Sequence, residues 1–192
     1  MVVITIESKQ TQMAKEIERV RFELTESKIH VKFIKKFSGF IFEGIVVPPA
    51  SKGSHLEIPY FIADFLRKQS IIEDFTLEFP TSLTDLTRTV RSEVRLGKIQ
   101  PLHPFFNVLV KEQILAENDI GEDSQFDEVE LKRKQSKFNQ LIHERATKIV
   151  KMAEASGTAP RKTDLTLSEE ILYKKLIDLV QSWKAEFIQK IG

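Results

Sequence analysis

The sequence contains no cysteine among its 192 residues. Disulfide bridges, cysteine-ligated zinc or iron–sulfur centres and thiol catalysis are therefore excluded. Only seven glycines occur, and they do not cluster as a phosphate-binding loop requires. No apolar run approaches the ~20 residues that a membrane-spanning helix needs, and the apolar start of the chain is too short for a signal peptide. We therefore expect a soluble intracellular protein.

Signatures of catalysis are also missing. The motifs GxxxxGK, GxGxxG and HExxH do not occur. The four histidines, His30, His55, His103 and His143, are scattered, and the pair of His55 and Glu57 lacks the third ligand that a metal needs. We predict no catalytic residue, no metal ligand and no cofactor. An enzyme with an unrecognised site is a weaker alternative, and pocket carboxylates with raised pKa values would support it.

Charged side chains are numerous but balanced in sign. Lysine and arginine total 29, aspartate and glutamate total 28, and together they make up 30% of the chain. Such a balance does not by itself predict a nucleic-acid or membrane partner, so any basic face must come from the local arrangement of residues. The length allows one medium domain or two small ones.

The first third of the chain is dominated by alternating β-branched and aromatic residues. Alternation predicts strands at residues 3–6, 29–33 and 40–42, whereas the spacing of apolar residues over 13–24 predicts a helix between the first two. Residues 46–54, "VVPPASKGS", have the composition of a loop.

The remaining residues have helical periodicity. Helices are predicted to begin near "TSLTD", at Pro104, near Gln125 and at "TLSE", where Thr166 and Glu169 have capping-box spacing. The expected buried stripes are Leu83, Leu86, Val90 and Val94; Phe105, Phe106, Leu109 and Ile114; and Phe138, Leu141, Ile142, Ile149 and Met152. The last helix carries the apolar stripe Leu172, Leu176, Leu179, Trp183 and Phe187. We therefore predict an α+β protein, with a small β-rich domain and short helices at 1–78 and an α-helical assembly domain at 79–192.

Residues 52–74, "KGSHLEIPYFIADFLRKQSIIED", place a short strand, a proline and an aromatic helix in quick succession. Proline ends a strand and suits the first turn of a helix, so the stretch predicts a helix packed on a small sheet, followed by another strand. The same stretch resembles the small β domain of GINS subunits. The matching residues are Gly53, Ser54, Leu56, Glu57, Pro59 and Ala63, while Phe61 stands where that family often has tryptophan.

Domain order extends the resemblance, because GINS subunits have either the helical or the β domain first. This chain resembles the β-domain-first type, represented by the archaeal subunit related to the eukaryotic partner-of-Sld-five proteins two and three. The resemblance implies a non-catalytic subunit that scaffolds the MCM replicative helicase in DNA replication. It implies a GINS subunit of opposite domain order as partner in a 2:2 tetramer, a RecJ-like helicase partner, and a cytoplasmic, nucleoid-associated location, or a nuclear one in a eukaryote.

A basic stripe follows the helix that is expected near residue 83. Arg88, Arg91, Arg95 and Lys98 are spaced for one helix face, with Glu93 placed to neutralise part of it. A solvated surface, an acidic partner and a phosphate backbone all fit this stripe. The last of these is the basis of an alternative function, a free-standing nucleic-acid-binding module with a direct but weak DNA contact.

Three further features leave two interpretations open. The last helix has a wide apolar stripe, which suits either a central helix or a subunit interface formed by Leu172, Leu176, Leu179, Trp183 and Phe187. Lysines 132 and 134 and the arginine between them are interpreted as an exposed, internally paired cluster. The phenylalanines of the strands fit a core better than a base-stacking platform; they are Phe33, Phe37, Phe40 and Phe42.

Overall fold

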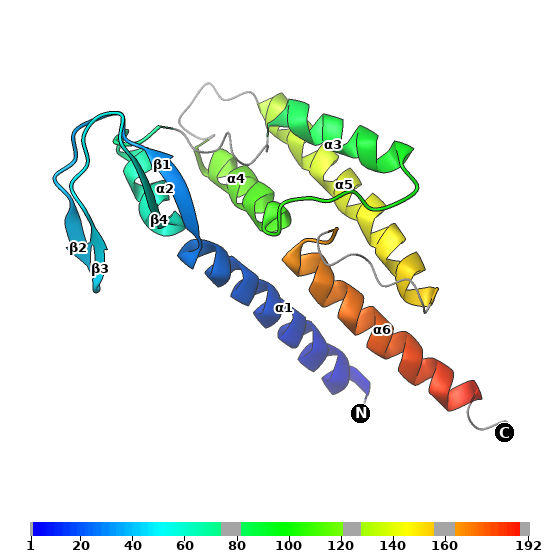
Figure 1. Ribbon diagram of the computed structural model, residues 1–192. Helices are drawn as coiled ribbons and strands as arrows, with labels where there is room; N and C mark the ends of the chain where they lie inside the picture. The colour runs from blue at the N-terminus through cyan, green and yellow to red at the C-terminus, as the bar shows by residue number, and fades with distance from the viewer. Residues whose placement is uncertain (1, 74–81, 121–127, 156–163, 189–192) are drawn as a thin grey trace. The chain divides into compact units, whose positions relative to one another are not determined.

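The computed structural model describes residues 2–73, 82–120, 128–155 and 164–188 (Figure 1). The chain is α+β, as predicted, with small antiparallel sheets within residues 28–59 and a helical region after them. Its contacts divide it into two compact units, Arg21–Phe79, and Met1–Val20 together with Pro80–Gly192. The predicted boundary at 78/79 lies outside the described residues, and residues 2–20 group with the helical unit.

The chain begins with a long helix, α1, at Val2–Glu26. The helix predicted over 13–24 is thus confirmed, but the strand predicted at 3–6 is wrong. A short apolar run fits a strand and a buried helix equally well. Propagating an existing helix costs less than starting a new element, because each added residue gains a hydrogen bond without a new nucleus.

Two antiparallel pairs of strands form the β region. β1 (Lys28–Lys32) pairs with β4 (His55–Pro59), so that Ile29 lies opposite Ile58. β2 (Phe40–Phe42) pairs with β3 (Ile45–Val47) in a hairpin. Its two turn residues, Glu43 and Gly44, have φ of 46° and 83°, the positive values that a tight hairpin turn requires. The loop predicted at 46–54 is therefore wrong at its first two residues, which belong to β3.

Helix α2 (Tyr60–Lys68) follows Pro59 directly, as predicted. The helix buries its residues Ile62, Ala63 and Leu66, where it packs on β1 and β4. Phe65 of the same helix is exposed. The strand expected after this helix is described only at its start, where Ile72 bridges Phe33 in antiparallel fashion.

The other unit contains four helices in addition to the first part of α1. They are α3 (Leu83–Arg95), α4 (Phe106–Ile120), α5 (Glu128–Glu154) and α6 (Leu167–Ile188). Their main core contains Leu86, Val90, Phe106, Val110, Ile114, Leu131 and Leu141. A second cluster of Ile99, Ile149 and Leu165 packs against Met152, Leu172, Tyr173 and Leu176.

The predicted stripes of this unit are confirmed in part. Val94 was expected to be buried, but it is largely exposed, because α3 turns its other side toward α5. Within the described part of the chain, no helix combines the length and the apolar character needed to cross a bilayer.

Candidate functional site

The C-terminal half of α6 carries three large apolar side chains on one face. Leu179, Trp183 and Phe187 follow one another at intervals of four residues, and 61%, 62% and 58% of their surfaces are exposed. The rings of Trp183 and Phe187 lie in contact, with centroids 5.2 Å apart. We call these three residues the α6 apolar face.

The two other residues of the predicted interface behave differently. Leu172 and Leu176 pack against the core cluster around Ile149. The predicted stripe therefore splits into an inner half that stabilises the helical unit and an outer half that faces solvent. Full burial of a side chain of this size contributes roughly 1.5–3 kcal/mol. Three such side chains on one face are characteristic of a protein–protein contact.

The residues of the family motif build the junction between β4 and α2. Gly53 has a φ of +87° in the turn before β4, and its amide donates to the Phe33 carbonyl over 2.7 Å. Pro59 ends the strand, and Ala63 is completely buried. The ring of Phe61 lies 6.4 Å from that of Phe42.

The remaining motif residues, Leu56 and Glu57, alternate on β4, where Leu56 is half-buried opposite Val31 and Glu57 is exposed opposite His30. These residues of the motif thus have evident structural roles or lie on the surface of the strand. They fix how the strand passes into the helix, and they do not converge on one point.

The basic stripe is exposed, but two details of its prediction are wrong. Arg88, Arg91 and Arg95 lie on α3, whereas Lys98 lies in the loop after the helix has ended. Glu93 does not neutralise the stripe, because its carboxylate is completely buried on the opposite side of the helix. We call the four cations the basic ridge.

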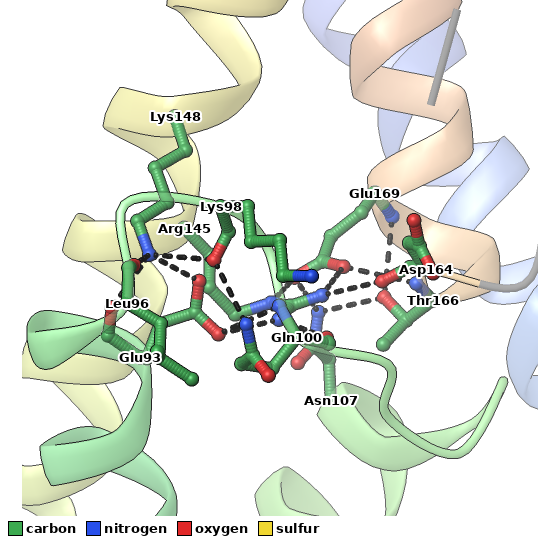
Figure 2. Close-up of polar contacts among 10 residues, drawn as sticks. All are labelled: Glu93, Leu96, Lys98, Gln100, Asn107, Arg145, Lys148, Asp164, Thr166 and Glu169. Carbon is green, nitrogen blue, oxygen red and sulfur yellow. Dashed lines mark hydrogen bonds and ion pairs between the residues drawn. The ribbon is translucent and has the colours of Figure 1, made fainter. Parts of the chain in front are cut away.

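Glu93 is part of a buried ion-pair network centred on Arg145 of α5 (Figure 2). The guanidinium of Arg145 donates to Glu93 Oε2 over 2.9 Å and to Glu169 Oε1 and Oε2 over 2.6 and 2.7 Å. Lys148 Nζ lies 2.8 Å from Glu93 Oε1. Two cations and two carboxylates therefore balance one another inside the helical unit.

The network also binds the loop that follows α3. Lys148 Nζ donates to the carbonyls of Leu96 and Lys98 over 2.7 and 3.1 Å. Arg145 Nη1 donates to the carbonyl of Gln100 over 2.8 Å. Figure 2 shows these cations reaching from α5 to the loop. These hydrogen bonds from Lys148 and Arg145 fix the path of the backbone from Leu96 to Gln100.

The charge state of Arg145 follows from its partners. Burial would lower its pKa, but hydrogen bonds and charge from Glu169, together with Glu93, raise the pKa above its ordinary value. The guanidinium therefore stays protonated across the physiological range. Buried pairs of this kind stabilise a fold only while every member is present.

The capping box predicted at the start of α6 is confirmed. The backbone amide of Thr166 donates to Glu169 Oε2 over 2.9 Å, and the amide of Glu169 donates to Thr166 Oγ1 over 3.4 Å. Glu169 therefore caps α6 and pairs with Arg145 at the same time.

The second cationic cluster is only partly the exposed surface that was expected. Lys132 and Arg133 are exposed, and Lys132 pairs with Glu128. Lys134 is buried and pairs with Glu117 of α4 over 2.6 Å. A neighbour on another helix, which sequence spacing could not reveal, decides the position of this lysine.

The core interpretation of the phenylalanines in the β region is confirmed for Phe33 alone. Phe33 is completely buried and stacks on Phe37 at 5.4 Å, while Phe40 meets Phe37 edge-on at 5.8 Å. Phe37 and Phe40 are half-buried, and Phe42 is half-exposed. The rings of Phe33, Phe37 and Phe40 contact one another, which fits a small packed cluster better than a row of separate stacking faces for bases.

The histidines do not converge. All four are exposed, and they lie in β1, β4, the loop before α4, and α5. Partial burial lowers the pKa of His103, whose Nδ1 accepts from the Phe105 amide over 3.3 Å. Among the residues that the structure describes, no group of three or more histidine, aspartate or glutamate side chains could hold a metal ion.

One pocket of about 290 Å³ lies between α1, α4, α5 and α6. Its walls are mostly apolar, with Met13, Phe138 and Leu172 among them. Asn107 lines it too, but its Nδ2 donates to Thr166 and Ser168 over 3.0 Å each. The carboxylate of Glu169 at its edge is already paired with Arg145. Of the charged residues in its lining, Glu169 is therefore paired, whereas Lys111 has no carboxylate within ion-pair distance in the described part of the chain.

Sequence reasoning missed the Arg145 network and the exposed hairpin residues Ile41 and Val46, which lie opposite each other on β2 and β3. The network joins residues 24 and 52 positions apart, so its members share no local spacing. One signal was present: Arg145 interrupts the apolar stripe of α5 between Leu141 and Ile149. A charge at a buried helical position indicates a partner on another element.

No protein-family model and no curated protein matches this sequence.

Proposed function

We propose that this protein is a non-catalytic assembly subunit that binds another protein chain through the α6 apolar face. The observation that carries this proposal is the exposure of Leu179, Trp183 and Phe187, each more than half open to solvent. Aromatic residues are enriched in the hot spots of protein interfaces, and tryptophan most of all. Because the helix is already formed, binding requires no further ordering of its backbone.

The partner that we propose is a GINS subunit of opposite domain order, in a tetramer of two chains of each kind. Support comes from the motif between Gly53 and Ala63 and from the order of a β region followed by helices. In this proposal the tetramer scaffolds the MCM helicase and a RecJ-like partner during DNA replication, in the cytoplasm of an archaeon. The protein contributes surfaces and needs no cofactor.

The first experiment is a measurement of solution mass by light scattering, for the chain alone and mixed with a helical-domain-first GINS subunit from the same source. We expect one stable mixed species of about four chains. A monomer that ignores that subunit would overturn the GINS proposal. Binding to a different protein through α6 would keep the assembly role and change the partner.

A matched pair of variants assigns the contact to α6. Replacing Leu179, Trp183 and Phe187 with serine removes the apolar face, so we expect the mixed species to disappear. The control replaces three exposed apolar residues on other helices, Leu115, Val129 and Val150, with serine, and should leave the mixed species intact. Equal loss of the mixed species in both variants would show that assembly depends on something other than this face.

A further inference from the structure

The basic ridge is a second surface, separate in position and chemistry from the α6 apolar face. Its four cations, Arg88, Arg91, Arg95 and Lys98, are all exposed. Only Arg88 has an acidic neighbour, Asp85, at 3.5 Å. Within the described ranges, Arg91, Arg95 and Lys98 have no carboxylate within ion-pair distance. Like charges this close repel one another, so a bound anion would be stabilised here.

Helix α3 separates its charges between two sides. Its arginines face outward, while Glu93 is completely buried and paired with Arg145 and Lys148. That carboxylate is neutralised by the buried Arg145 and the half-buried Lys148 and cannot offset the ridge. Among the described residues, Asp85 is therefore the one carboxylate that offsets the positive potential over the outer side of α3 at ion-pair distance.

The ridge is also fixed in shape. Seven residues of helix separate Arg88 from Arg95, which corresponds to about 10.5 Å along the axis. Beyond the helix, Lys98 is held in place because its carbonyl accepts from Lys148 Nζ over 3.1 Å and from Gln100 Nε2 over 3.2 Å. The four positive charges thus form a linear array whose backbone is ordered before any ligand arrives.

We infer that the basic ridge binds the phosphate backbone of a nucleic acid. Three of its four cations are arginines, whose planar guanidinium groups recognise phosphate with two hydrogen bonds. A linear array suits a polymer that repeats its negative charge at short intervals. The ridge carries no aromatic side chain, and Val94 is the only large apolar residue exposed on α3. Protein interfaces concentrate aromatic residues, whereas nucleic-acid interfaces are polar and strongly positive.

This binding would be independent of nucleotide sequence. Cations that touch phosphates position a nucleic acid without reading its bases. The phenylalanine cluster belongs to the other unit and takes no part in this inference. The inference also stands independently of the assembly role, because it depends on α3 and the loop after it.

The test measures binding of fluorescein-labelled single-stranded DNA and duplex DNA by anisotropy over a range of salt concentrations. For wild-type protein, we expect the logarithm of the affinity to fall with the logarithm of salt by about 0.7 per phosphate neutralised on single strands. The variant with Arg88→Gln, Arg91→Gln and Arg95→Gln should bind about tenfold more weakly at low salt. Its salt slope should become shallower by about 1 for each arginine that no longer neutralises a phosphate.

A matched control removes the same number of positive charges elsewhere. Lys132→Gln, Arg133→Gln and Lys137→Gln lie on α5, and this variant should keep the wild-type slope and affinity. Equal weakening in the two variants, or no binding by the wild type, would overturn the inference. Poly-glutamate that binds the ridge as tightly as DNA would overturn the choice of nucleic acid in favour of an acidic protein. Light scattering with the partner subunit, run on the same variants, keeps this result separate from the assembly test.

Discussion

At the scale of single residues, Arg145 contributes most to the helical unit. It is completely buried, yet it contacts two carboxylates and two backbone carbonyls that come from α3, the loop after α3, the residues just before α6 and the start of α6. A leucine at this position would continue the apolar stripe of α5 but could not satisfy those groups. The buried polar partners therefore make the arginine indispensable.

The variant Arg145→Met leaves Glu93 paired with Lys148 alone and deprives the buried Glu169 of its cation. We expect a loss of about 3–5 kcal/mol in the free energy of unfolding, measured by urea denaturation with circular dichroism. The control Arg133→Met changes an exposed position of the same helix and should alter stability by less than about 0.5 kcal/mol. If Arg145→Met lowered the free energy of unfolding by less than about 0.5 kcal/mol, water or a rearranged lysine would have to replace the guanidinium.

At the scale of elements, the sequence predicts the ends of helices and strands best where a residue type favours a single backbone geometry. Pro59 marks the passage from strand to helix, and Thr166 with Glu169 marks the start of α6; both are where they were expected. Prediction is wrong at residues 3–6, where four residues are too few to separate the two periodicities. The outer position of Val94 depends on how α3 packs, which its own spacing does not determine.

The capping box gives a prediction about α6 as an element. Thr166→Ala removes the hydroxyl that accepts from the Glu169 amide and contacts Asn107, so we expect a loss of about 1 kcal/mol in unfolding free energy. Thr166→Ser keeps the oxygen and should retain most of the stability. The same urea titration compares both variants, and identical losses for alanine and serine would assign the effect to the buried methyl group instead.

At the scale of the whole molecule, the sequence predicted only part of each candidate surface, the basic ridge and the α6 apolar face. The exposure of Arg88, Arg91 and Arg95 follows from helical spacing, whereas the position of Lys98 beyond the end of α3 does not. Which half of the α6 stripe is open does not, because Leu172 and Leu176 are covered by residues from α5 and from the segment before α6. The Arg145 network lay beyond prediction for the same reason, since its partners meet only after the helices have packed.

The assembly role predicts that a partner raises thermal stability. A ligand that binds only the folded state, at a hundredfold excess over its Kd, stabilises it by about 2.7 kcal/mol. We therefore expect the melting temperature of the chain to rise when the opposite-order GINS subunit is added, as monitored by differential scanning fluorimetry. The serine variant of the α6 apolar face should melt at the same temperature with and without that subunit. A rise in that variant too would place the interface elsewhere.

The hydrogen bonds that Arg145 and Lys148 donate to the loop after α3 have a practical consequence for labelling this protein. Surface loops usually accept inserted tags, because their backbones make few contacts. Here the carbonyls of Leu96 and Lys98 accept from the half-buried Lys148, and that of Gln100 accepts from the buried Arg145, so one added residue would move them out of register and break these hydrogen bonds. The hairpin turn at Glu43 and Gly44, exposed at the far end of β2 and β3, is the safer position for a fluorophore.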